Sequence, residues 1–510
     1  MNIKRAKQEI INTVRAYLAK DEFGAYRIPA VRQRPILLMG PPGIGKTQIM
    51  EQIANELDID LVAYTITHHT RQSALGLPFI EHRSFGGREY AVTEYTMSEI
   101  LAAVWQAMER SGRKEGILFL DEVNCISETL APMMLQFLQC KTFGNQRLPE
   151  GWIIAAAGNP PEYNKSVREF DVVTLDRVKR IDVKEDYAAW KEYALRRGIH
   201  GAILSYLDIR KDHFYKVEAG PEGMQFVTAR GWEDLSEILH TYEALGLTAD
   251  REVVGQYLQM PAIAKDFANY LELYAKYRRV YRVEEILNGN WEALRARELA
   301  AAPFDEKLSV LGLVLSRLNE SARAAWQLDQ LAGLLHESLL RVKAALGQTP
   351  AAQILTAELA GLDRQIAAKK EAGSADRQGM QLLNQAARTL EGYLHTLELE
   401  APAEPFDRLK ELFSETLEQR AAATDETGSY LANAFAFLDE SLPGSQELVI
   451  FATELTAGFY TSWYIETFGC EAYFAHNKDL LFADTENALL GEIAAARAAQ
   501  NGTAGEELTL

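Results

Sequence analysis

Ile36-Leu37-Leu38-Met39-Gly40-Pro41-Pro42-Gly43-Ile44-Gly45-Lys46-Thr47 is the stretch that decides the fold of this chain. Its first four residues form an apolar run typical of a buried strand, and its last eight fit the phosphate-loop pattern G-x-x-x-x-G-K-[ST]. Apolar residues at helical spacing follow, from Ile49 to Leu57. A strand that turns through glycines into an amphipathic helix is the setting that this motif requires. The sequence therefore predicts a nucleotide-binding α/β domain.

Each residue type in the loop suits phosphate binding for its own reason. The glycines let the backbone curl, so that successive N–H groups point at phosphate oxygens, and the positive end of the helix beginning near Lys46 adds to the attraction. Lys46 is predicted to reach the β- and γ-phosphates, and Thr47 to offer its hydroxyl to Mg²⁺. The predicted nucleotide-binding residues are Gly40, Pro41, Pro42, Gly43, Ile44, Gly45, Lys46, Thr47 and Gln48.

Two carboxylates end another apolar run. Residues 116–120 are followed directly by Asp121 and Glu122. At the carboxyl edge of a parallel sheet such side chains face the ligand crevice. Mg²⁺ keeps several waters and needs few protein ligands, so Asp121, acting through water, suffices together with Thr47. Glu122 is predicted to orient and deprotonate the water that attacks the γ-phosphate.

A polar residue ends a further apolar run, at residues 152–157. Asn159 follows this run and stands before Pro160 and Pro161. Its amide could contact the γ-phosphate or the attacking water. An Asn-Pro turn that simply closes a strand explains the same residues, and spacing alone leaves the two interpretations open.

The predicted fold class is a P-loop α/β core, a parallel five-stranded sheet between helices, followed by a helical lid and an all-α C-terminal region. The sheet is predicted from short apolar runs at residues 35–39, 59–64, 116–120, 152–157 and 178–183. We expect a core with an N-terminal helix at 1–185, a wholly helical lid at 186–290, an acidic helical domain at 291–500 and a disordered tail at 501–510. Long helical patterns with Gly and Pro breaks predict antiparallel helices, as a bundle or an arm, beyond residue 290.

Composition and charge limit the classes of partner and the cellular compartment that we expect for this chain. The net charge is −19, and most of it falls beyond residue 290, which disfavours nucleic acid as a partner there. The chain has 3 cysteines without paired spacing, so they indicate neither a disulfide framework nor a zinc site. The N-terminus reads as an amphipathic helix rather than a signal peptide, and no apolar run is long enough to span a bilayer. We therefore expect a cytoplasmic protein.

Taken together, these segments resemble the AAA+ ATPase superfamily and, within it, the MoxR-like family, over roughly residues 30–290. The residues that carry the resemblance are Gly40 to Thr47, Leu120-Asp121-Glu122-Val123-Asn124, Ala156-Ala157-Gly158-Asn159-Pro160, Leu175-Asp176-Arg177 and Leu75-Gly76-Leu77-Pro78. Val178 stands where the family has Phe, which should change only packing. The last 200 or so residues resemble nothing in the family.

The resemblance implies further roles. Asn159 matches the position called sensor 1, and Arg177 matches the arginine finger, which completes the active site of a neighbouring subunit. Arg180, three residues on, is the alternative finger. Arg230, within Thr-Ala-Arg-Gly-Trp at residues 228–232, matches sensor 2, which contacts the γ-phosphate from the lid.

The family also implies ATP and Mg²⁺ as ligands, a homo-oligomeric ring with a hexamer as the expected size, and a client protein. MoxR-like proteins commonly act on partners with a von Willebrand A domain. This chain lacks the Asp-x-Ser-x-Ser pattern of that domain, so such a partner would be a separate protein. Residues 84–90 and 143–151 pair glycines with aromatic or basic side chains, and either they grip a client or they are ordinary surface turns.

The leading hypothesis is thus an ATPase whose hydrolysis cycle remodels or activates a partner protein. The alternative is a nucleotide-dependent binding scaffold with little turnover, although a pure binder has no need of Glu122. A nucleic-acid motor is disfavoured by the charge distribution, and a GTPase by the absence of an Asn-Lys-x-Asp segment. A small-molecule kinase is disfavoured by the chain length and by the set Asn159, Arg177 and Arg230.

Overall fold

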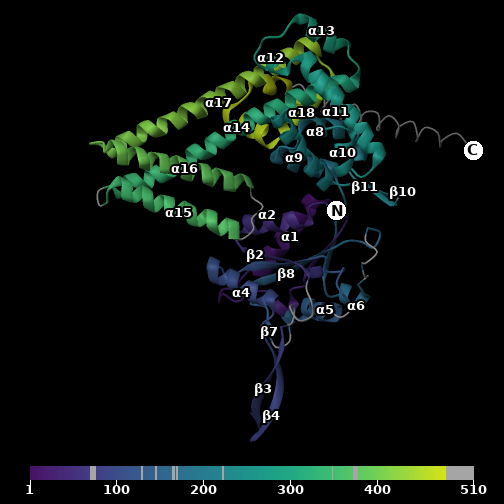
Figure 1. Cartoon of the computed structure of the whole chain (residues 1–510), viewed down its shortest axis with the longest axis vertical. Coiled ribbons are helices and arrows are strands. Elements are labelled where there is room, and N and C mark those ends of the chain that lie inside the picture. The colour runs from purple at the N-terminus through teal and green to yellow at the C-terminus, as the bar shows by residue number, and fades with distance from the viewer. Residues whose placement is uncertain are drawn as a thin grey trace, which may run out of the picture. The chain divides into compact units, whose positions relative to one another are not determined.

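The computed structural model of the chain describes residues 1–68, 76–127, 130–143, 146–163, 167, 170–220, 223–346, 349–371 and 377–477 (Figure 1). It divides into two compact units, which are described separately. Unit 1 comprises Met1–Trp190, Thr228–Gly231 and Ala368–Arg377. Unit 2 comprises Lys191–Val227, Trp232–Ala367 and Gln378–Leu510.

Unit 1 is built on a five-stranded sheet in the order β2-β5-β8-β1-β9. Its strands are β1 (Ile36–Met39), β2 (Asp60–Thr65), β5 (Gly116–Asp121), β8 (Trp152–Gly158) and β9 (Lys179–Asp182). Every pairing is parallel. The predicted parallel five-stranded sheet is confirmed, and each strand coincides with one of the short apolar runs.

Helices cover both faces of this sheet because its central strands are buried on both sides. Alternate strand residues such as Leu118 and Ile154 pack with α4 (Glu99–Ser111) and α5 (Ala131–Cys140) in one apolar cluster. The other residues, such as Phe119 and Ile153, are equally buried. On their side the sheet meets α2 (Lys46–Leu57), and α1 (Ile3–Leu18) packs on α2. The shorter helices of this unit are η1 (Ala30–Arg32), η2 (Ile66–His68) and α6 (Val172–Leu175), and α7 (Tyr187–Arg197) begins at its end.

The register of the strands brings several chain segments to one edge of the sheet. Met39, the last residue of β1, lies beside Gly158 of β8, and Thr65 of β2 lies beside Asp121 of β5. The loops that leave these strands at their carboxyl ends are therefore neighbours in space. They are the loops on which the candidate site residues stand.

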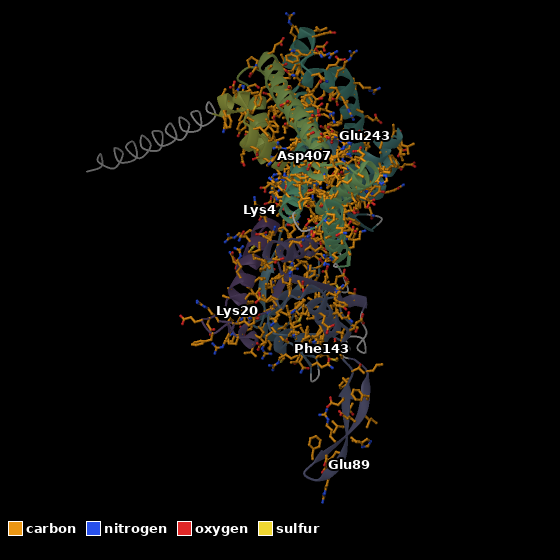
Figure 2. All side chains as sticks on the ribbon, turned by 90° about the vertical axis from the view of Figure 1, so that its left-hand side faces the viewer. Lys4, Lys20, Glu89, Phe143, Glu243 and Asp407 are labelled. Carbon is orange, nitrogen blue, oxygen red and sulfur yellow. The ribbon has the colours of Figure 1, made fainter. Side chains whose placement is uncertain are left out.

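Two antiparallel hairpins extend from unit 1. The larger joins β3 (Pro78–Phe85) to β4 (Arg88–Tyr95), and the smaller joins β6 (Thr142–Phe143) to β7 (Gln146–Arg147). Figure 2 shows Glu89 near the tip of the larger hairpin, which projects from the body of the unit. Residues 84–90, predicted to be a loop, form the end of the larger hairpin, and the smaller hairpin overlaps the start of the second predicted loop, residues 143–151.

Within the residues that the structure describes, unit 2 is helical except for one hairpin. Its helices after α7 are α8 (Gly201–Ile209), η3 (Lys211–His213), α9 (Ala229–Leu245), α10 (Arg251–Tyr257), α11 (Pro261–Tyr281), α12 (Val283–Leu287), α13 (Ala293–Ala301), α14 (Phe304–Ala345), α15 (Ala351–Glu371), α16 (Arg377–Glu400), α17 (Pro405–Ser441), α18 (Gln446–Ala457) and α19 (Phe459–Phe468). One apolar cluster joins the first half of α14 to α17, α18 and α19. A second joins the other half of α14 to α15, α16 and the start of α17. The expected all-helical C-terminal region is confirmed.

The hairpin of β10 (Lys216–Gly220) and β11 (Gly223–Val227) corrects one expectation. Residues 186–290 were predicted to be wholly helical, and this prediction was wrong. The two strands are short alternating runs flanking a Gly-Pro-Glu-Gly turn sequence, and Val217, Phe226 and Val227 favour extended backbone.

Two further expectations concern the C-terminal tail and membrane-spanning helices. The tail at residues 501–510, expected to be disordered, lies outside the described residues. Among the helices that the structure describes, none combines the length and the apolar character needed to cross a bilayer.

Candidate active site

The phosphate loop leaves β1 and enters α2 through positions that only glycine fits well. A Cβ on Gly40 would come within 2.6 Å of the carbonyl oxygen of Val183. Gly43 has φ +73°, and a Cβ there would lie 3.2 Å from the side chain of Thr228. A side chain at either position would therefore clash or strain the backbone. The loop is held close to two other segments of unit 1.

Lys46 is the first residue of α2, and its ammonium group is buried in the curl of the loop. Its Nζ donates to the carbonyl oxygens of Gly40 (2.9 Å) and Pro41 (2.8 Å) and to Oδ1 of Asn159 (2.8 Å). Burial is the main cause that lowers the pKa of Lys46 to about 8. The ammonium is therefore less stable here than in water, and phosphate groups would supply the negative charge that the buried group lacks.

Thr47 and Asp121 meet across the loop. The Thr47 hydroxyl donates to Oδ2 of Asp121 at 2.7 Å, and Oδ1 of Asp121 accepts from the backbone N–H of Glu122 at 2.9 Å. A hydroxyl and a carboxylate at this separation are oxygen ligands of the kind that Mg²⁺ prefers. Both side chains border solvent, so the remaining coordination positions can be filled by waters and phosphate oxygens. The donor set fits the predicted Mg²⁺.

Glu122 follows in a left-handed backbone conformation, with φ +55°. A residue other than glycine rarely adopts this conformation, and it is often found at functional sites. Oε2 of Glu122 accepts a hydrogen bond from the Thr67 hydroxyl at 3.0 Å. Thr67 lies in η2, just after β2, and sequence reasoning missed it. In the sequence, the only indication of such a role for Thr67 is that it is a polar residue shortly after the end of a predicted strand.

Asn159 and Asn124 form a paired arrangement at the end of β8. Nδ2 of Asn124 donates to the Asn159 carbonyl oxygen (2.8 Å), and Oδ1 of Asn124 accepts from the Asn159 backbone N–H (3.3 Å). Asn124 is buried, so these bonds fix the backbone from which the Asn159 side chain reaches Lys46. Asn124 is a positioning residue that the sequence analysis quoted within a motif but did not assign.

Arg230 also lies beside the phosphate loop. It belongs to the part of α9 that is grouped with unit 1, next to Thr228. Its Cβ would be 3.6 Å from a Cβ on Gly43, and its positive charge contributes to lowering the pKa of Lys46. The structure therefore brings the predicted sensor 2 arginine to the loop. Gln48, one turn into α2, is exposed.

The two candidate finger arginines lie elsewhere in unit 1, and both are exposed. Arg177, between α6 and β9, donates from Nη1 to Oε1 of Gln139 on α5. Arg180, on β9, pairs with Asp182 at 2.9 Å. The site thus assembles Lys46, Thr47, Asp121, Glu122, Asn159 and Arg230, while Arg177 and Arg180 have partners outside this set.

Comparison with known proteins supports the same region. Residues 36–176 match the family model described as ATPase family associated with various cellular activities (AAA). No curated protein matches the chain. Among solved structures, two mutants of RuvB from Thermotoga maritima are similar at 14% identity, covering 39% of this chain, with a TM-score of 0.24. The match spans 51%, about half, of the length of those chains.

The family match begins at β1 and ends just after α6, so it contains the phosphate loop, both carboxylates and Asn159. These are the residues that the geometry brings together at one edge of the sheet. The chain therefore carries, over residues 36–176, a domain of the AAA ATPase family, whose chemistry is the hydrolysis of ATP.

Proposed function

We propose that this chain is a MoxR-like AAA+ ATPase that works as a homo-oligomeric ring, with a hexamer as the expected size, and remodels or activates a separate client protein. One observation carries the proposal. Every predicted group for binding and hydrolysis meets at the phosphate loop, except the finger arginine, which is exposed and contacts Gln139 instead. A site that lacks one cation of its own is suited to receive it from a neighbouring copy.

Within one subunit the division of labour follows from the contacts. Lys46 gives up its loop carbonyl partners for the β- and γ-phosphates of ATP. Thr47 and Asp121 would hold Mg²⁺, which when bound neutralises charge on the phosphate oxygens. Glu122 accepts a proton from the attacking water, and the Asn159 amide orients that water or the γ-phosphate. Positioning and charge neutralisation are what phosphoryl transfer chiefly requires.

Arg177 is the better supported finger. Its hydrogen-bond partner Gln139 is a neutral amide, and the arginine acts on the nearby carboxylate of Asp171 only through electrostatic attraction. Arg180 instead pairs with the carboxylate of Asp182 on its own strand. Exposed ion pairs are weak, however, and do not by themselves remove Arg180 from consideration. The experiment below therefore includes both.

The β3–β4 hairpin is the proposed client contact. It exposes 71% of Ile80, 55% of Phe85 and 49% of Tyr90, and the rings of the last two lie 6.2 Å apart, so exposed apolar side chains gather near the tip as they do at interaction sites. An isolated two-stranded hairpin is marginally stable, so a partner would also stabilise it. Three expectations remain predictions: that the client has a von Willebrand A domain, that the compartment is the cytoplasm, and that nucleic acid is a disfavoured partner.

Subunit complementation tests the shared site. Steady-state ATP hydrolysis is measured against protein concentration for the wild type, Glu122→Gln, Arg177→Ala and Arg180→Ala, with light scattering on the same samples. Each of the first two variants should be inactive alone. An equal mixture of Glu122→Gln and Arg177→Ala should regain activity, because some interfaces then combine an intact Glu122 with an intact Arg177.

The outcomes separate the hypotheses. Recovery in the mixture, with activity that rises alongside an oligomer, supports the ring. Inactive Arg180→Ala with active Arg177→Ala moves the finger to Arg180. Hydrolysis by a monomer, or a mixture as inactive as its components although subunits exchange, contradicts the shared site. Tight ATP binding without turnover at any concentration favours the scaffold alternative.

A further inference from the structure

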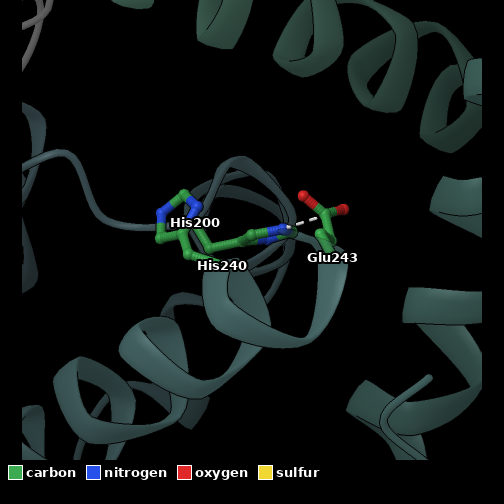
Figure 3. A group of neighbouring side chains, drawn as sticks. All are labelled: His200, His240 and Glu243. Carbon is green, nitrogen blue, oxygen red and sulfur yellow. Dashed lines mark ion pairs between the residues drawn. The ribbon is translucent and has the colours of Figure 1, made fainter. Parts of the chain in front are cut away.

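His200, His240 and Glu243 form a compact cluster in unit 2, far along the chain from the phosphate loop (Figure 3). One potential ligand atom from each side chain lies within 4.8 Å of those of the other two. His200 stands before α8, and His240 and Glu243 lie three residues apart on α9. That spacing places the last two side chains on the same face of the helix. We propose that this cluster binds a divalent transition-metal ion, zinc, with an open coordination position.

The chemistry of the donor set narrows the choice of metal. Two imidazoles and one carboxylate suit Zn²⁺ and also Fe²⁺, whereas Mg²⁺ and Ca²⁺ prefer oxygen ligands alone. Nε2 of His200 and Oε1 of Glu243 are 3.3 Å apart. Two ligands about 2.1 Å from a tetrahedral ion are separated by about 3.4 Å. This pair is therefore already spaced as two corners of a zinc site, and His240, whose ligand atom lies within 4.8 Å of both, would supply the third.

The hydrogen bond that His240 makes outside the cluster determines which of its ring nitrogens can bind a metal. Nε2 of His240 lies 3.1 Å from the carbonyl oxygen of Gly198. Donation to that oxygen fixes the tautomer and leaves Nδ1 with its lone pair, an arrangement common among zinc-bound histidines.

His200 needs one adjustment. Its Nδ1 accepts from the backbone N–H of Ala202 at 3.2 Å, capping α8, so in the metal-free state the proton sits on Nε2 and faces Glu243. Zinc at Nε2 replaces that proton, which moves through solvent to Nδ1, and the Ala202 N–H loses its acceptor. One capping hydrogen bond is thus exchanged for a metal–ligand bond, and the imidazoles release no net proton.

The surroundings leave room for a fourth ligand. The cluster lines a cavity of about 360 Å³, whose wall also includes Tyr274, Arg278 and Glu320. Oε1 of Glu243 also accepts from Arg278 at 3.2 Å, so Arg278 competes with the metal for this oxygen. A water or a ligand group in the cavity can complete the shell.

Sequence spacing gave no hint of this site, because His200 reaches the other two residues only in the folded chain, where its backbone N–H donates to Oγ of Ser236 on α9 at 2.8 Å. A bound ion would join the start of α8 to the C-terminal end of α9. It would therefore stabilise the folded state by mass action, by an amount that grows with the zinc concentration.

Zinc titration of the full-length chain, without a histidine tag and after chelator treatment, tests the proposal. Binding is followed by calorimetry and by competition with a chromophoric chelator. The variants are His240→Ala and Glu243→Gln, with His395→Ala as a matched control, since His395 is an exposed histidine on α16 outside the cluster. All are made in a Cys140→Ser background, which removes the exposed thiol as a zinc ligand.

We expect one zinc per chain, at least about tenfold weaker binding in the two cluster variants, and no change in the control. Zinc should raise the melting temperature of the wild type and the control but not of the cluster variants. Cobalt in place of zinc should give the visible bands of a tetrahedral ion only where the cluster is intact. Equal zinc affinity in all variants, or no retention at micromolar zinc, would overturn the proposal. Glu243→Gln preserves the shape of its side chain, so it decides the question if His240→Ala fails to fold.

Discussion

The buried ammonium of Lys46 should set the pH range over which this chain binds ATP. Its pKa is lowered from 10.5 to about 8, chiefly by burial. Asp121 and Glu122 oppose this shift, and Arg230 adds to it. Phosphate groups beside the ammonium favour its charged form, so the complex holds a proton that the free protein has lost above pH 8. ATP affinity must therefore fall as the pH rises through this value.

The size of the effect follows from the two protonation equilibria. If ATP restores the pKa of Lys46 to its ordinary value or higher, affinity falls about eightfold between about pH 7.5 and about pH 9, or about 1.2 kcal/mol. ATP itself is fully ionised over this interval, so its own titration contributes little. Arg230→Ala removes a positive charge near Lys46 and should move the midpoint of the fall to higher pH.

Equilibrium titration with a fluorescent ATP analogue and Mg²⁺, repeated at several pH values, measures this dependence. Lys46→Arg is the matched control because its guanidinium remains charged throughout the range. Whatever its absolute affinity, that variant should show a flat profile. A flat profile for the wild type would mean that Lys46 stays charged and that the burial argument is wrong. An equally steep fall in Lys46→Arg would assign the titration to another group.

Three further changes probe the site. Thr67→Val frees the carboxylate of Glu122 from a hydrogen bond and should raise the rate of basal ATP hydrolysis severalfold. A lower rate would instead mean that Thr67 holds Glu122 in the orientation needed for catalysis. Asn124→Ala removes both hydrogen bonds to the Asn159 backbone and should cost about 2 kcal/mol of stability, seen by denaturant unfolding, with slower hydrolysis at unchanged ATP affinity. Gly43→Ala forces a side chain into left-handed backbone beside Thr228. Calorimetry should therefore show weaker ATP binding, and denaturant unfolding should show a stability loss of about 1–2 kcal/mol. Wild-type values in both measurements would contradict the strain argument.

The sheet was predictable because its strands are buried on both faces. A strand such as β8 must be apolar throughout, so a short run bounded by polar residues marks it without knowledge of its neighbours. The phosphate loop was predictable because its glycines and lysine are required by phosphate geometry. The hairpins were harder to predict. Most of β3 and β4 is exposed, so no apolar face marks either strand, and β10 and β11 were hidden in a helical region.

Sequence by itself predicted which residues the AAA domain would use for ATP, since Lys46, Thr47, Asp121 and Glu122 stand in or next to the segments that follow recognisable strands. Only the tertiary structure decided which residues support them. Thr67 reaches Glu122, and Asn124 fixes Asn159, because parallel register sets separate strand ends side by side. Helix packing rather than strand register brings His200 to its partners on α9, which lie far along the chain from it. Contacts between distant segments leave no periodic trace in a sequence, because they depend on how the elements pack rather than on local spacing.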